Sequence, residues 1–235
     1  MAIEPTATTR QEASTLHEAL DGAEGGDAGF ALKWVRRFLE QIRDRERTPA
    51  AKLHPLGFHC IPVYRSDDFG LCVHGWLPGA RRETSPTSDM HMHTFDMTSM
   101  VLHGEVINKE LDLVAAGPKR YRIFEIDKDG GEDVDLFTDT GLDTAVLEHD
   151  PVKVSPGQTY SIRSKVYHSA EETMRKGDFT VTLMLAKNWD DGPQRTLVEL
   201  ERAAATPLRY ERRLLSSSET RRAAREIGNL LESAR

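Results

Sequence analysis

The sequence predicts a mainly β protein, a single antiparallel sandwich or barrel with helices at both ends. Two observations lead to this prediction. The middle of the chain, residues 55–192, alternates short β-branched and aromatic segments with turns that contain glycine and proline. The flanking segments, 30–54 and 193–235, instead place their apolar residues at helical spacing. With 235 residues, the chain has the length of one barrel domain with a substantial core.

The N-terminal part divides into a tail and a helix. Residues 1–29 are polar and are expected to be flexible, with one short helix followed by the glycine-rich linker 21–27. Residues 30–54 are expected to form a helix that docks on the main domain, because one face of the segment is apolar. The residues of this face are Phe30, Trp34, Val35, Phe38, Leu39 and Ile42.

The barrel segment, residues 55–192, contains nine candidate strands. They cover residues 57–64, 70–77, 89–93, 97–107, 119–126, 144–148, 158–163, 166–170 and 178–187. The acidic stretch 127–133 follows one of them. It does not fit a calcium-binding loop, because Glu132 stands where such a loop needs glycine. A solvated hairpin insertion is therefore expected there.

The C-terminal segment, residues 193–235, is expected to be helical. After Pro193, three apolar residues form one stripe: Leu197, Leu200 and Ala204. Further on, Ser216 and Glu219 have the spacing of a capping box, which marks a helix start. The apolar face of this last helix consists of Ile227, Leu230 and Leu231.

Charge and composition exclude several classes of function. The net charge of −7 argues against nucleic acid or an anionic membrane as a partner. No apolar run approaches the roughly 20 residues that cross a bilayer, and the N-terminus lacks the features of a secretory signal. The two cysteines, Cys60 and Cys72, are too few for a disulfide scaffold. They could lie on adjacent strands, but buried free thiols in a reducing, cytoplasmic setting are expected.

Three histidines have the spacing of a metal site. His91 and His93 are one residue apart on a predicted strand, so their imidazoles lie on the same face. His168 on a facing strand would complete a site with three nitrogen ligands. Such a site leaves coordination positions open for water, substrate or oxygen.

With this motif, the segment 55–188 resembles the cupin superfamily, whose small β-barrels often hold one metal ion. The first cupin motif joins a His-x-His pair to a later glutamate and glycine, and here His91, His93 and Gly104 match it. The glutamate position is occupied by Met97, a departure from the motif. The second motif runs from a Pro-Gly turn to a histidine, and residues 156–168 match it. The resemblance implies a double-stranded β-helix, or jelly-roll, barrel.

Among cupins, the chain is most similar in pattern to thiol dioxygenases such as cysteine dioxygenase, which hold Fe(II) with three histidines. The match includes Tyr64 and Arg65 at the end of one strand and Trp76 at the end of the next. The resemblance implies catalytic roles for Tyr64 and Arg65, with Arg65 holding a substrate carboxylate. The chemistry of Arg65 agrees, because a planar guanidinium binds a carboxylate through two parallel hydrogen bonds.

The chain departs from thiol dioxygenases on a later strand. These enzymes carry a Ser-x-His-x-Tyr triad there, and the corresponding residues are Thr182, Met184 and Ala186. A thiol substrate is therefore less well supported than the three-histidine site. Residues expected beside the metal or along its pocket are Asp96, His74, Ser99 and Tyr160. Asp96 has the wrong strand parity for a ligand and is expected to orient a histidine or to cap the strand.

The sequence thus predicts a mononuclear metal-binding enzyme, with Fe(II) the favoured ion and Zn(II) the next. The favoured activity is a non-haem iron dioxygenase of a small carboxylated substrate. Two alternatives are open: a zinc cupin that catalyses a non-redox step, such as isomerisation or bond formation, and a cupin that binds a small ligand without turnover. The expected partners are a small-molecule substrate and, as a homodimer, a second copy of the chain.

Overall fold

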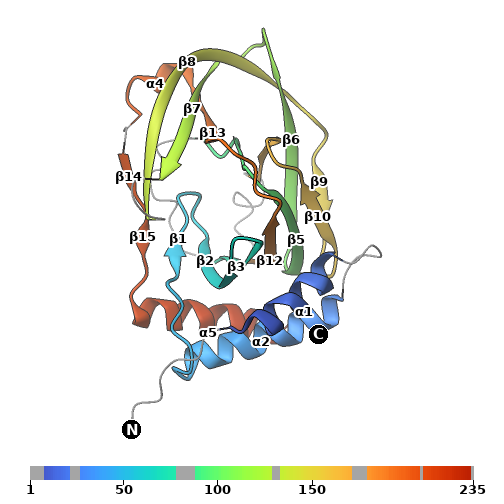
Figure 1. The fold of residues 1–235 in the computed structure, drawn as a ribbon. Coiled ribbons are helices and arrows are strands. Elements are labelled where there is room, and N and C mark those ends of the chain that lie inside the picture. Colours follow the sequence, from blue (N-terminus) through green and yellow to red (C-terminus); the bar gives the residue numbers. More distant parts are fainter. Residues whose placement is uncertain are drawn as a thin grey trace.

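The structure of the protein is a computed structural model. It describes residues 8–21, 27–77, 88–128, 133–170, 179–206 and 209–233. Two antiparallel sheets face each other in one barrel, and helices lie at both ends of the chain (Figure 1). The predicted mainly β fold is therefore confirmed. No helix among the described residues has the length and apolar character needed to cross a membrane.

The first sheet has seven strands and lies next to the helices (Figure 1). In spatial order its strands are β10 (Thr159–Ile162), β5 (Asp96–His103), β12 (Thr180–Lys187), β3 (Phe69–Trp76), β2 (His59–Arg65), β1 (Lys52–Leu53) and β15 (Arg213–Leu214). One face of this sheet packs on the helices through residues such as Leu71, Val73 and Leu183. Because side chains alternate along a strand, Cys72, His74 and Trp76 of β3 lie on the other face, inside the barrel.

The second sheet has eight strands and arches over the first (Figure 1). Its strands are, in order, β14 (Arg209–Glu211), β8 (Val134–Glu148), β7 (Tyr121–Lys128), β13 (Gln194–Glu199), β4 (His91–Met92), β11 (Tyr167–Ser169), β6 (Val106–Val114) and β9 (Val152–Val154). The far end of the long strand β8 also pairs with β6. Strand β9, the part of β6 after residue 107 and the part of β8 before residue 144 lie outside the strand segments predicted from the sequence.

Three helices cover the outer face of the seven-stranded sheet: α1 (Arg10–Asp21), α2 (Ala28–Arg43) and α5 (Ser217–Ser233). Helix α1 is the short helix expected within residues 1–29, and the linker residues 22–26 lie outside the described part. In α2 the expected face is buried at Val35, Phe38, Leu39 and Ile42. The Asp27 carboxylate caps its start by accepting a hydrogen bond from the Phe30 amide at 2.9 Å. The helix ends before β1, so the prediction of a helix over all of 30–54 is too long.

The C-terminal segment differs from its prediction in the first part and agrees in the second. The stripe through Leu197 is not helical, because residues 194–199 form β13, which pairs with β7 and β4. The helix directly after β13 is α4 (Leu200–Ala203), which has only four residues. The capping box is confirmed: the Ser216 amide donates to Glu219 at 2.9 Å and the Glu219 amide donates back to the Ser216 hydroxyl at 3.3 Å.

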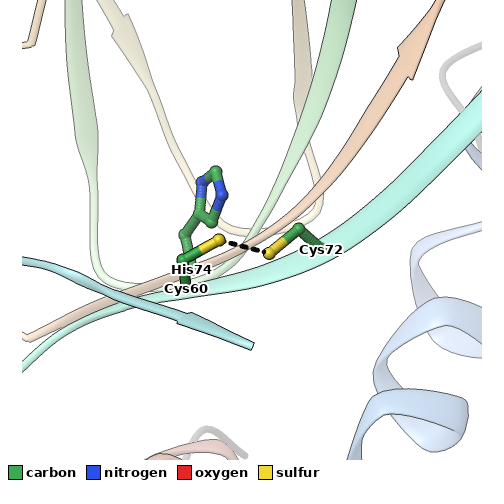
Figure 2. Close-up of side chains that lie close together, drawn as sticks. All are labelled: Cys60, Cys72 and His74. Atoms are coloured by element: carbon green, nitrogen blue, oxygen red, sulfur yellow. Dashed lines mark hydrogen bonds between the residues drawn. The ribbon is translucent and has the colours of Figure 1, made fainter. Parts of the chain in front are cut away.

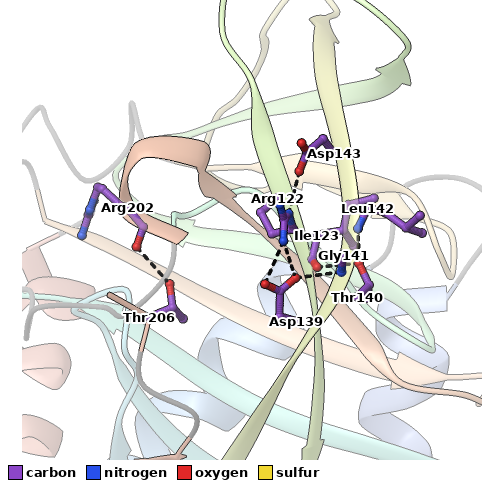
Figure 3. A network of polar contacts seen from close by, with 9 residues as sticks. All are labelled: Arg122, Ile123, Asp139, Thr140, Gly141, Leu142, Asp143, Arg202 and Thr206. Carbon is purple, nitrogen blue, oxygen red and sulfur yellow. Dashed lines mark hydrogen bonds and ion pairs between the residues drawn. The ribbon is translucent and has the colours of Figure 1, made fainter. Parts of the chain in front are cut away.

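The acidic segment lies in the hairpin of β7 and β8, as expected, although residues 129–132 are outside the described part. Further along β8, the strand bulges at Gly141, which has a left-handed φ of 72°. Arg122 of β7 holds the bulge through ion pairs with Asp139 and Asp143, at 2.9 and 2.6 Å (Figure 3). This contact network keeps the second sheet paired on both sides of the bend.

Candidate metal centre

The three predicted ligand histidines meet on the eight-stranded sheet. His91 lies on β4 and is paired with His168 of the neighbouring strand β11, and His93 follows directly after β4. The ring centroids are 4.7 Å apart for His91 and His93, 4.5 Å for His91 and His168, and 5.0 Å for His93 and His168. One nitrogen from each ring lies within 4.8 Å of the other two. The structure therefore brings together a three-histidine group that could hold one metal ion.

Backbone carbonyls fix two of the rings. Nδ1 of His91 lies 2.7 Å from the Asp89 carbonyl, and Nδ1 of His168 lies 3.2 Å from the Val166 carbonyl. A carbonyl oxygen only accepts hydrogen bonds, so in both rings Nδ1 carries the proton and donates. The lone pair of each imidazole is then on Nε2, which is left for a metal. This arrangement is the usual support of a ligating histidine.

The third ring, His93, is held by stacking. It lies nearly parallel to Phe95, with the ring centroids 4.6 Å apart. Its buried Nδ1 has no hydrogen-bond partner among the described residues. A buried nitrogen without a partner is costly unless a ligand or water satisfies it. Three imidazoles that converge, one of them unsatisfied, fit a metal ion in both chemistry and position.

Burial keeps these imidazoles neutral. Desolvation, with a smaller contribution from the neighbouring His91, lowers the pKa of His168 to about 3. Desolvation also lowers the pKa of His91 and His93, and for His93 the charges of His91 and His168 add to it. A neutral imidazole has a free lone pair for a metal, whereas an imidazolium has none. The site is therefore ready to bind a cation at neutral pH.

No carboxylate joins the three histidines among the residues that the structure describes. Asp96, at the start of β5, instead accepts hydrogen bonds from the Ser164 amide at 2.9 Å and from the Asn188 side chain at 2.8 Å. These bonds, first the one from Asn188, lower the pKa of Asp96. Asp96 thus ties the start of β5 to the loop that leads into His168. Of the two roles expected for it, capping the strand is the one that its contacts match.

The wall opposite the histidines is formed by β3, β5, β10 and β12. His74 lies on the inner face of β3, close enough for its charge to lower the pKa of His93. Ser99 is buried and pairs across the sheet with Tyr160. Burial raises the pKa of Tyr160 to about 12, and a hydrogen bond with Ser99 opposes the rise. The expected pocket residues His74, Ser99 and Tyr160 are therefore on one continuous inner wall.

Two further polar groups on this wall were not singled out as pocket residues from the sequence. Thr182 is directly opposite His74 in the pairing of β12 and β3, and Trp76 is two residues further along β3. The Thr182 hydroxyl and the Trp76 indole nitrogen are buried without hydrogen-bond partners among the described residues. Strand parity with His74 was the available signal for Trp76.

Arg65 and Tyr64 lie on opposite faces of β2. The ladder with β3 shifts register between Pro62 and Tyr64, which turns Tyr64 outwards to pack on the core beneath the helices. The structure therefore does not bring Tyr64 to the histidines, and the catalytic role expected for it has no geometric support. Arg65 instead lies over the Trp189 ring at 5.6 Å.

Aromatic contacts connect Arg65 to the histidines. The Trp189 ring contacts Phe95 at 4.8 Å between centroids, and Phe95 stacks on His93. The rings of Trp189 and Phe95 thus lie between Arg65 and the predicted ligand His93. Sequence reasoning did not single out Phe95 or Trp189. For Phe95 the signal was its parity, since Asp89, His91, His93 and Phe95 are spaced by two.

Comparisons with known proteins add to the description of the fold. No family model matches the sequence, and no curated protein matches it. Solved structures do show similarity at low sequence identity. A cupin superfamily protein from Desulfitobacterium hafniense is 10% identical over 56% of this chain and 76% of its own, with a TM-score of 0.28. Hydroquinone 1,2-dioxygenase, solved with Cd2+ and 4-hydroxybenzonitrile, is 11% identical over 66% of this chain and 76% of its own, with a TM-score of 0.31.

A third similar structure is a protein with a double-stranded β-helix domain from Klebsiella pneumoniae. It is 15% identical over 60% of this chain and 84% of its own, with a TM-score of 0.25. At such identities and TM-scores, the three structures carry nothing about activity, which has to be argued from the site itself.

Proposed function

We propose that the protein is a metal-dependent cupin oxidoreductase, most specifically a non-haem Fe(II) dioxygenase of a small carboxylated molecule. The observation that supports it best is the group of His91, His93 and His168, three neutral imidazoles without a carboxylate among the described residues. Such a donor set leaves the full double charge on a divalent ion and leaves coordination positions open. Fe(II) bound there would supply oxygen activation beside a bound substrate.

The chain's own residues would bind and orient the substrate. Arg65 is assigned as the cation for the carboxylate, as the resemblance to thiol dioxygenases implies. Its guanidinium lies over Trp189, whose ring contacts Phe95 next to His93. On the wall opposite the histidines, Thr182 and Trp76 offer buried polar groups that have no hydrogen-bond partner among the described residues. A substrate with hydroxyl or amino groups would satisfy them.

Cysteine is expected to be a poor substrate. In thiol dioxygenases, which the sequence resembles, a Ser-x-His-x-Tyr triad follows on a later strand. Thr182, Met184 and Ala186 occupy those positions on β12. The methionine and alanine side chains cannot relay a proton. A carboxylate without a thiol is therefore the preferred substrate class.

A zinc enzyme with non-redox chemistry is the second candidate, because three neutral imidazoles also suit Zn(II). Binding of a small ligand without turnover is the third. The discriminating experiment is oxygen uptake by iron-loaded protein against cysteine, 3-mercaptopropionate and a panel of small amino and hydroxy acids. The proposal expects uptake with a member of the acid panel and little with cysteine. Uptake with none of them, together with zinc in the purified protein, would reject the dioxygenase.

A further inference from the structure

The only two cysteines of the chain lie in direct contact inside the barrel. Cys60 is on β2 and Cys72 is on β3, and their sulfur atoms are 2.8 Å apart (Figure 2). Both are on the inner face, since Cys60 pairs with His74 and Pro62 pairs with Cys72 in the same ladder. His74 lies beside Cys60, and its ring nitrogen is within 4.8 Å of both sulfur atoms. The contact is therefore a dithiol with a base next to it.

The two thiols are not equivalent. Cys60 is partly exposed and Cys72 is buried. A hydrogen bond from Cys72, with a further one from His74, holds the pKa of Cys60 well below its ordinary value, whereas burial raises the pKa of Cys72. A thiolate on the less buried cysteine, with a protonated thiol behind it, is the arrangement in which the first cysteine attacks and the second resolves.

A metal ion fits this pair less well than a covalent bond. Two thiolates on one tetrahedral zinc, each at about 2.3 Å, are about 3.8 Å apart. The observed separation of 2.8 Å leaves no room for an ion between the sulfur atoms. A disulfide, with a bond of about 2.05 Å, needs the two side chains to approach by less than 1 Å.

We propose that Cys60 and Cys72 are a reversible redox site that forms an internal disulfide by exchange with a low-molecular-weight disulfide. Cys60 gives its proton to His74, and its thiolate attacks one sulfur of the small disulfide. That sulfur–sulfur bond breaks, a mixed disulfide forms on Cys60, and one small thiolate leaves. Cys72 then loses its proton, attacks the Cys60 sulfur and displaces the second small thiolate from the mixed disulfide.

The overall exchange balances. Two protein thiols and one small disulfide give one internal disulfide and two small thiols. The protein pair is oxidised by two electrons, and the small disulfide is reduced by the same two. The released thiolates take up the two protons. None of the groups in this exchange belongs to the three-histidine group, so the exchange itself needs no metal there.

The experiment equilibrates the chelator-treated full-length protein with glutathione buffers of graded reduced-to-oxidised ratio. The reaction is quenched with acid, and free thiols are alkylated after unfolding and counted by mass spectrometry. The expected result is that both thiols are lost together, with one internal link joining positions 60 and 72. Oxidation should also raise the Tm by about 5–10 °C, because a disulfide that closes a short loop stabilises a chain of this size by that order. Two thiols that stay reduced in fully oxidised glutathione would overturn the proposal.

Two serine variants test the order of attack. In Cys72→Ser, glutathione should remain on Cys60 as a stable mixed disulfide, because the resolving thiol is missing. In Cys60→Ser, the buried Cys72 should stay free. A reversed pattern would overturn the assigned roles. A competing metal site at the cysteines is tested by measuring zinc in His91→Ala, which lacks one of the three histidines. If this variant binds one zinc, and the double variant His91→Ala/Cys60→Ser does not, the cysteines form a metal site and not a redox pair.

Discussion

His168 and His91 face each other as a registered pair across the ladder of β11 and β4, with their ring centroids 4.5 Å apart. They are far apart in the sequence, so the strand register brings them together. A slip of one residue in this ladder would turn one of the two rings to the opposite face of the sheet. The candidate metal centre is thus a direct product of the barrel's pairing.

The first prediction concerns acid stability of the metal-free protein. The pKa of His168 falls from 6.5 to about 3 on folding, so between these values the unfolded chain binds more protons. The stability that neutral His168 provides is complete above pH 6.5 and is lost as the pH falls towards 3. The slope from this residue is at most about 1.4 kcal/mol per pH unit. Urea midpoints from pH 7 to 4 should therefore fall more steeply for wild type than for His168→Asn.

His149 provides the control for this prediction. It is exposed, and its hydrogen bond with Asp112 raises its pKa, so its contribution has the opposite sign. The His149→Asn variant should keep the acid slope of wild type or steepen it. Equal slopes for wild type and His168→Asn would contradict the buried neutral imidazole.

The second prediction concerns Asp96. Asp96→Ala removes the acceptor of the Ser164 amide and of the Asn188 side chain. The loss should destabilise the fold by about 1–2 kcal/mol. It should also weaken metal binding by about 10–100-fold without abolishing it, because the loop into His168 loses its anchor. Asp67→Ala, at an exposed position in the turn after β2, should change neither quantity. Complete metal loss in Asp96→Ala would instead indicate a ligand.

The third prediction separates two glycines with the same backbone angle. Gly104 and Gly141 both have a φ of 72°. A Cβ on Gly104 would collide with the backbone carbonyl of Phe179, whereas no heavy atom of the described residues lies within 4 Å of a Cβ on Gly141. Gly141→Ala should cost about 1 kcal/mol from strain alone. Gly104→Ala should cost about 3 kcal/mol or more in urea unfolding, because a steric clash adds to the strain. Similar costs would contradict the packing at Gly104.

The fourth prediction tests substrate binding by Arg65. Once an oxygen-consuming substrate is found, Arg65→Ala should raise its KM by about 10–1000-fold, because a charged hydrogen-bonded pair is lost. The KM of Arg65→Lys should lie between those of wild type and Arg65→Ala, because lysine keeps the charge without the bidentate geometry. Arg43→Ala, at the end of α2 on the helical side, is the matched control. An unchanged KM in Arg65→Ala would contradict the assignment of the substrate carboxylate to Arg65.

Some of this structure could be predicted from local pattern. The two-residue spacing of His91 and His93 and the strand parity of Ser99 both indicated the inner face. The apolar stripe of α2 and the capping box of α5 were equally visible, because helix spacing and caps are local signals.

Other features depend on tertiary pairing and could not be predicted in this way. Residues 194–199 carry an apolar pattern that fits a helix or a strand, and pairing with β7 and β4 decides for the strand. Tyr64 was expected to have a catalytic role, but the register shift after Pro62 turns it to the helices. The contact of Cys60 with Cys72 likewise depends on how β2 and β3 pair.

The most direct test of the account is the metal content of the protein, purified without chelators or an affinity metal. Elemental analysis of wild type should find about one divalent ion per chain. In His91→Ala it should find none, because a ligand is lost. The fold of this variant should be unchanged, because the barrel has its own apolar core. His103→Ala, at the end of β5, serves as the control and should keep its metal. Wild-type protein that binds no ion when iron or zinc is added, or His91→Ala protein that keeps the full amount, would contradict the three-histidine centre.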